Sequence, residues 1–129
     1  MQQRAKTVET NPLKWDVTSA GHIQAGQTSK DAAIRELSEE VGLEVNEKDL
    51  HYLLTYKNKK ILENYLDNQF YDCYLVKQKC IDMNKIKMQE SEVEQVKMCN
   101  FNEVKEMIEK NQVVTRNEFY IEILKYLKN

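Results

Sequence analysis

An α/β fold, in which helices pack against a sheet, is predicted by the order of patterns along this 129-residue chain. Segments rich in aromatic and β-branched residues alternate with segments whose apolar residues recur at helical spacing. A chain of this length is expected to form one domain, residues 1–129, with one core and one principal site. No repeat, low-complexity tract or linker divides it.

The first predicted helix runs from about Ser29 to Val41. A short strand and a loop over residues 15–26 lead into it. Thr28 suits the N-cap, Asp31 stands where a capping box needs an acid, and Gly42 stands where a left-handed C-cap is required. The apolar stripe of this helix consists of Ala33, Ile34, Leu37 and Val41.

Three more strands and two more helices follow. The strands are predicted over residues 51–56, 69–76 and 93–98, with a polar segment of lysines and asparagines joining the first two. The helices are predicted from two sets of apolar residues that each share one helical face. These sets are Phe101, Val104, Met107 and Ile108, and Phe119, Ile123, Leu124 and Leu127.

Charge and composition exclude several classes of function. A formal net charge of −2 provides no overall basic field, so polymeric nucleic acid is not an expected partner. No apolar run approaches the roughly 20 residues that cross a bilayer. Without that run or an apolar leader, we expect a cytoplasmic protein with no membrane partner. The three cysteines are odd in number and lack zinc-site spacing, which argues against a disulfide framework or structural zinc.

The first predicted helix carries a cluster of acidic side chains. Glu36, Glu39 and Glu40 stand at positions i, i+3 and i+4, so their carboxylates are expected on one side, opposite the apolar stripe. Crowded carboxylates repel one another, and in a cleft their pKa values rise unless a cation intervenes. Clustered oxygen ligands suit Mg²⁺ or Mn²⁺. Taken alone, a glutamate-rich face is more often a solvated surface, so its sequence context decides its meaning.

That context is a long ordered motif. Gly21 is followed after five residues by Gln27, and after seven more by residues 35–43, RELSEEVGL. This pattern resembles the Nudix box and departs from its defining positions only at Gln27, where the family has glutamate. The resemblance implies an α/β/α sandwich with a mixed sheet. It also implies a divalent-metal-dependent reaction in which water attacks a diphosphate that is linked to another moiety, such as a nucleotide.

The resemblance assigns roles within the box. Glu36, Glu39 and Glu40 would hold Mg²⁺ or Mn²⁺, and Glu36 would orient or deprotonate water. Arg35 is expected to pair with a box carboxylate rather than with the substrate. The amide of Gln27 accepts a hydrogen bond but supplies neither charge nor a base. Two hypotheses follow: a hydrolase of lowered activity, or a catalytically weak module that binds a phosphorylated ligand.

Two further candidate ligands lie outside these glutamates. Glu90, Glu92 and Glu94 are spaced by two, which would place them on one face of a strand. Glu92 is preferred among them as a metal ligand or base, and the alternative is a solvated strand face. His22 follows the glycine as a metal-binding histidine does in isopentenyl diphosphate isomerases and their hydrolase-like relatives, which residues 15–22, WDVTSAGH, resemble. The alternative for His22 is a structural hydrogen bond.

This second resemblance adds a third hypothesis, an isomerase of prenyl diphosphates. In those isomerases the residue before the glycine is a catalytic cysteine, whereas Ala20 occupies that position here. Alanine cannot protonate an alkene carbon, so isomerase activity ranks last. Trp15 is a core anchor or a stacking surface for ligand, with the anchor preferred. The residues that would recognise the substrate are not identified by the sequence.

The amino-terminal segment bears on oligomeric state. Related domains place further strands ahead of the box, whereas 20 residues precede Gly21 here. Residues 1–4 are therefore expected to be the tail of a strand whose start is absent. Truncation, an internal start site and completion of the sheet by a partner chain would each explain this. Because an exposed sheet edge pairs readily with another chain, we expect either a homodimer or poor solubility.

Overall fold

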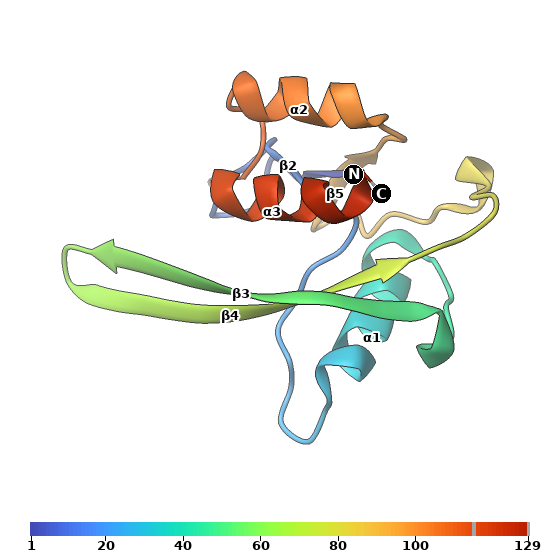
Figure 1. Cartoon of the computed structure of the whole chain (residues 1–129), viewed down its shortest axis with the longest axis horizontal. Coiled ribbons are helices and arrows are strands. Elements are labelled where there is room, and N and C mark those ends of the chain that lie inside the picture. Colours follow the sequence, from blue (N-terminus) through green and yellow to red (C-terminus); the bar gives the residue numbers. More distant parts are fainter. Residues whose placement is uncertain (115, 129) are drawn as a thin grey trace.

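The computed structural model describes residues 1–114 and 116–128, and within them it contains three α-helices and two small antiparallel sheets (Figure 1). The α/β class is therefore found. In chain order the elements are β1 (Gln2–Arg4), β2 (Trp15–Asp16), α1 (Ser29–Val41), β3 (Leu50–Leu62), β4 (Tyr65–Val76), β5 (Val93–Val96), α2 (Phe101–Glu109) and α3 (Asn117–Leu127). Two 3₁₀ turns, η1 (Glu47–Asp49) and η2 (Met83–Lys85), lie in the connections.

The smaller strands form a three-stranded sheet in the order β2-β1-β5. Gln2, in the middle strand, pairs with Asp16 on one side and Val96 on the other. A parallel bridge between Trp15 and Val113 adds the segment after α2 to this region. The expected single mixed sheet is not found among the described residues, because β3 and β4 pair with each other and form a separate sheet.

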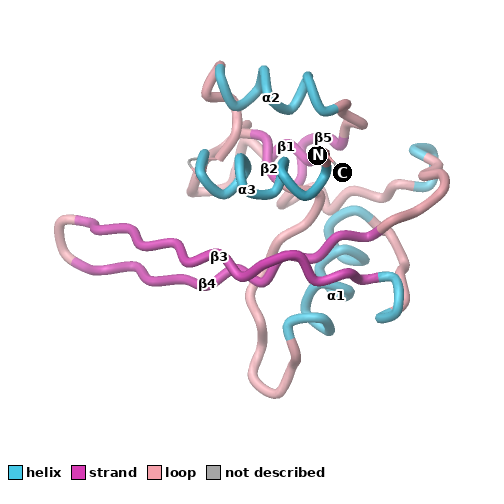
Figure 2. The backbone as a smooth tube through the Cα atoms, in the orientation of Figure 1, coloured by secondary structure: helices cyan, strands magenta, loops and turns pink. Residues whose placement is uncertain are grey.

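The second sheet is a long hairpin, β3–β4, whose far end reaches away from the helices (Figure 2). Both strands are longer than the predicted segments 51–56 and 69–76. The polar segment that we expected to join them is itself paired, with Asn58 opposite Gln69 and Lys59 opposite Asn68. The prediction of a loop was wrong here because strands pair through their backbones. The side chains on the solvent-facing side of a two-stranded ribbon can therefore be polar.

Helices cover opposite faces of this hairpin (Figure 1). On one face, the hydroxyl groups of Ser29, at the start of α1, and Tyr74 are hydrogen-bonded. On the other, the ring of Phe119 from α3 lies 5.3 Å from that of Tyr56, centroid to centroid. The core cluster beneath α3 comprises Cys73, Met107, Val113, Phe119 and Tyr120. Trp15 packs against it, which agrees with the anchor role.

A buried polar network ties the loop before α1 to the carboxyl-terminal helix. Arg116 Nη2 lies 2.6 Å from Asp16 Oδ2, and the Tyr120 hydroxyl donates a hydrogen bond to the same carboxylate. Asp16 ends β2, so this network fixes the point from which the chain runs on to Gly21. Within the described ranges, the structure contains no helix of the length and apolarity that a membrane crossing requires.

Candidate functional site

Helix α1 forms as its end signals predict. The Thr28 hydroxyl accepts a hydrogen bond from the backbone N–H of Asp31, and the Asp31 carboxylate accepts one from the backbone N–H of Thr28. At the other end Gly42 adopts φ 70°, and its N–H reaches the carbonyls of the last turn. The capping box, the left-handed C-cap and the bounds Ser29–Val41 are all confirmed. A rigid helix of known register therefore carries the box glutamates.

The three glutamates do not share one environment, which corrects the expectation that all project from one side. Glu40 is 8% exposed and buried among other residues. The side chain of Glu36 is 16% exposed, whereas that of Glu39 is 52% exposed. Successive residues of an α-helix differ in direction by about 100°, so Glu39 and Glu40 face differently. Glu36 and Glu40, one turn apart, make an inward pair.

Gly21 lies directly against the carboxyl group of Glu36. A Cβ atom at position 21 would come within 2.1 Å of Glu36 Cδ and 2.2 Å of Glu36 Oε1. Any side chain there would displace the carboxylate. The first glycine of the box thus leaves room for the Glu36 carboxyl group between the loop and α1.

Arg35 fixes the other side of Glu36. Its Nη1 lies 2.8 Å from Glu36 Oε1 and 3.1 Å from Glu39 Oε2. Its Nη2 donates to the backbone carbonyl of His22 at 3.1 Å. The expected pairing of Arg35 with box carboxylates is therefore confirmed. The guanidinium ties α1 to the loop and sets the direction of the Glu36 carboxylate.

Glu40 is held by neutral donors. The side-chain amide of Gln2 donates a hydrogen bond to Glu40 Oε2, and the backbone of Ala20 also hydrogen-bonds to this carboxyl group. Burial raises the pKa of Glu40 to about 7, and the nearby negative charges of Glu36 and Glu92 act in the same direction. The two hydrogen bonds act against that rise. The role of Gln2 was not predicted, because no local sequence pattern links it to Glu40, which lies 38 positions away.

The downstream acids are arranged differently from the prediction. Strand β5 begins at Val93, so Glu90 and Glu92 precede it in a turn, and the three acids do not share one strand face. Glu92 lies within electrostatic range of Glu40. Glu94 Oε2 instead accepts a hydrogen bond of 3.4 Å from the backbone N–H of Lys6. Glu92 is therefore the downstream acid whose charge acts on a glutamate of the box.

Two residues that the motif singled out lie in the loop before α1. His22 is exposed, and its backbone carbonyl, bound by Arg35, is its contact with the box. Gln27 Oε1 accepts a hydrogen bond of 3.2 Å from the backbone N–H of Gln24, which closes a turn. A glutamate at position 27 would accept the same bond, so the substitution changes charge without changing the turn.

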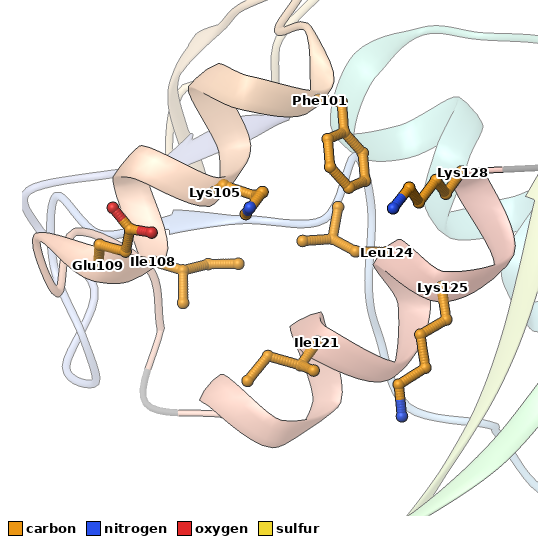
Figure 3. A pocket seen from close by; sticks show the side chains of 8 residues that line it. All are labelled: Phe101, Lys105, Ile108, Glu109, Ile121, Leu124, Lys125 and Lys128. Atoms are coloured by element: carbon orange, nitrogen blue, oxygen red, sulfur yellow. The ribbon is translucent and has the colours of Figure 1, made fainter.

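The chain's ability to hold a metal rests on few groups. Among residues 1–114 and 116–128, no three His, Cys, Asp or Glu side chains are gathered as a set of metal ligands. A cavity of about 340 Å³ lies elsewhere, between α2 and α3, lined by apolar side chains such as Phe101 and Leu124 and by lysines (Figure 3). No glutamate of α1 lines that cavity.

Comparison with known proteins places this geometry in a family. The model of the NUDIX domain matches residues 1–120. Nudix hydrolase 3 of Arabidopsis thaliana is 31% identical over 113 residues, which are 85% of this chain and 15% of that protein. An uncharacterized Nudix hydrolase of Clostridium acetobutylicum is 32% identical over 78 residues, 60% of this chain and 37% of that protein.

A third relative, an uncharacterized Nudix hydrolase of Listeria monocytogenes, is 30% identical over 96 residues, 71% of this chain and 57% of that protein. The matched part is less than two thirds of the length of each relative. The family match nevertheless covers nearly all of this chain, including the box and the glycine that contacts Glu36. The chain belongs to the Nudix hydrolase family.

Proposed function

We propose that this domain is a divalent-metal-dependent hydrolase that cleaves a diphosphate linked to another moiety, a nucleotide or a related phosphorylated small molecule. The observation that supports this most is the inward pair Glu36 and Glu40, set one turn apart on α1, with Gly21 against the Glu36 carboxyl group. Family membership supports the reaction class, and the whole-protein activities of the longer relatives are not transferred with it.

The inward pair fits Mg²⁺ or Mn²⁺. Its donors are all oxygen, and Mg²⁺ commonly takes only one or two protein carboxylates together with phosphate oxygens. Among the described residues no cation pairs with Glu40, while Glu36 and Glu92 both raise its pKa through their charge. A bound divalent ion would relieve this repulsion, neutralise charge on the diphosphate and acidify water. Glu39 and His22 are further candidate ligands at its edge.

Each residue then has a task in the hydrolysis. Glu36, held by Arg35, accepts the proton of a water molecule whose oxygen attacks phosphorus. The bond from that phosphorus to the bridging oxygen breaks, and the bridging oxygen keeps the electron pair and leaves as part of the other phosphate group. Glu40 would supply a second carboxylate, and its negative charge, to a divalent cation bound beside Glu36. Arg35 keeps the Glu36 carboxylate directed at the loop of Gly21.

The test is phosphate release, coupled to a phosphatase or pyrophosphatase, on nucleoside triphosphates, nucleotide sugars, dinucleotides and prenyl diphosphates with Mg²⁺ or Mn²⁺. The native chain is compared with Glu36→Gln and with Glu47→Gln, an exposed glutamate in η1 outside the box. We expect metal-dependent turnover that Glu36→Gln loses and Glu47→Gln retains. Turnover that needs no metal, or that survives Glu36→Gln, would exclude this function.

A second candidate, a weak Nudix domain that binds a phosphorylated ligand, is favoured by Gln27, which brings no charge to the site. The variant Gln27→Glu separates the two, because it preserves the turn and restores the charge. A rise of roughly a hundredfold or more in kcat/KM, about 3 kcal/mol, would identify the natural domain as impaired. A change below about tenfold supports a working hydrolase.

The third candidate, an isopentenyl diphosphate isomerase-like activity, has less support. Ala20 contributes its backbone to Glu40, and its methyl group cannot donate a proton. Conversion of isopentenyl diphosphate to its isomer without phosphate release, detected by proton NMR, would restore this candidate.

A further inference from the structure

Gln2 is one of three buried polar or charged residues among those that the structure describes, and it is 6% exposed. It lies in the middle strand of the smaller sheet, between Asp16 and Val96. Neighbouring strands on both sides hold its backbone, so its side chain starts from a fixed position. In this respect Gln2 differs from an exposed glutamine, whose side chain can adopt many conformations.

Both N–H groups of the Gln2 amide have partners. Gln2 Nε2 donates to Glu40 Oε2 on α1 and, at 3.1 Å, to the backbone carbonyl of Thr18. Thr18 lies three residues before Gly21, which contacts Glu36. One side chain therefore joins β1, the loop that begins the box and the carboxyl-terminal turn of α1.

The charge of the donor is as informative as its position. Arg35 binds Glu36 as a cation and offsets part of its charge, whereas Gln2 binds Glu40 as a neutral amide. A neutral donor fixes the direction of a carboxylate and leaves its negative charge available. That combination suits a carboxylate whose partner is a metal ion.

We propose that Gln2 is a positioning residue that orients Glu40, together with the Thr18–Gly21 loop, for binding of the divalent ion. The proposal rests on the proposed function, since it concerns the same metal. It assigns a role to a residue 38 positions from its partner and outside the Nudix box. Gln2 acts through Glu40 and does not touch the reacting atoms.

The neighbouring residue supplies a matched control. Gln3 is the same residue type on the same strand, but its amide donates to the backbone carbonyl of Leu13 at 2.9 Å and accepts from Gln95 Nε2 at 2.7 Å. The variants Gln2→Met and Gln3→Met each replace an amide by an apolar group of similar length. They differ in whether the lost donor belonged to Glu40.

The experiment measures Mn²⁺ affinity by electron paramagnetic resonance of the free ion, with kcat and KM at several Mn²⁺ concentrations. We expect Gln2→Met to weaken Mn²⁺ binding about tenfold or more, and Gln3→Met to leave it unchanged. Excess Mn²⁺ should restore the kcat of Gln2→Met with little change in KM for the diphosphate. A folded Gln2→Met protein with native Mn²⁺ affinity would overturn the proposal, because a purely structural amide affects stability alone.

A second measurement keeps the test independent of how well Gln2→Met folds. In the metal-free protein, Glu40→Gln should shift the side-chain amide NMR resonance of Gln2 and leave that of Gln3 in place. Addition of Mn²⁺ to the native protein should broaden the Gln2 resonance first. An unshifted Gln2 resonance would refute the positioning role, whereas a shifted one in a protein that binds no Mn²⁺ would count against the proposed function instead.

Discussion

Helix α1 and the far half of the β3–β4 hairpin differ in what their side chains do. Along α1 the caps are paired, Glu40 is buried and Arg35 bridges two glutamates and the loop. Along the far hairpin, the face that carries Lys57, Lys59 and Phe70 is exposed throughout. In α1 the side chains define the structure, and in the far hairpin the backbone pairing does. Substitutions should therefore change chemistry in α1 and association in the hairpin.

The largest effect is expected from the inward side of α1. Glu36→Gln should lower kcat/KM by about 10³-fold, roughly 4 kcal/mol, because it removes the residue that we propose as both metal ligand and proton acceptor. Glu39→Gln, on the exposed side, should cost only about tenfold, since it loses a screened contact with Arg35. Steady-state kinetics with Mg²⁺ measure both. Equal losses would remove the distinction between the two sides of α1.

The next effect concerns stability without metal. Burial raises the pKa of Glu40 from 4.5 to about 7, so the folded protein favours the protonated carboxyl group. The stabilisation that the folded protein gains from protonated Glu40 is complete below pH 4.5 and is lost as the pH rises through 7. Between about pH 4 and pH 8 the free energy of unfolding should fall by about 3 kcal/mol through this group.

The measurement is urea unfolding of metal-free protein across that range, with Glu40→Gln as the reference that lacks the titrating group. Subtracting the two curves isolates Glu40 from Glu36 and Glu92, whose charges act on it. A flat difference curve would show that Glu40 is not buried as the structure has it.

A smaller loss is expected from the glycine that contacts Glu36. Gly21→Ala should lower kcat/KM about 10- to 100-fold by moving the Glu36 carboxylate. Gly26→Ala is the control, because Gly26 has φ 81° and a Cβ there would meet no atom within 4 Å. This variant should lose about 1 kcal/mol of stability and keep its full activity. If Gly21→Ala retained full activity, the contact with Glu36 would have no functional weight.

The hairpin should affect association and leave chemistry unchanged. Ile61, Leu66 and Phe70 lie on its exposed face, each more than half exposed, and a lone two-stranded ribbon is marginally stable in water. The sheet edge first expected to pair with another chain is not exposed, because β1 is the middle strand of the β2-β1-β5 sheet and is paired on both sides. We expect a second copy of the chain to cover the hairpin face instead, which would give the homodimer. Light scattering should report a dimer for the native chain and a monomer for Phe70→Glu with Ile61→Glu. A native chain that is monomeric would contradict the predicted dimer. The control is the kcat of the double variant, which should equal that of the native chain.

The same contrast shows what the sequence predicted. Local signals, namely Thr28, Asp31 and Gly42, were enough to place α1, because caps act within one turn. The burial of Glu40 was not predictable, since it depends on Gln2 and the Ala20 backbone, which are distant in sequence or lack a side-chain signal. The length of the hairpin was missed because Lys59 and Asn68 resemble loop residues, although their backbones pair.

The most direct test of the central claim, that Glu36 and Glu40 form the metal-binding pair, is a Mn²⁺ titration followed by electron paramagnetic resonance. Four proteins are compared: the native chain, Glu36→Gln, Glu40→Gln and Glu39→Gln. We predict that Glu36→Gln and Glu40→Gln each weaken Mn²⁺ affinity by about a hundredfold or more. The Mn²⁺ affinity of Glu39→Gln should stay within about tenfold of the native value. Loss of binding in Glu39→Gln equal to that in Glu36→Gln, or full binding in Glu40→Gln, would contradict the account.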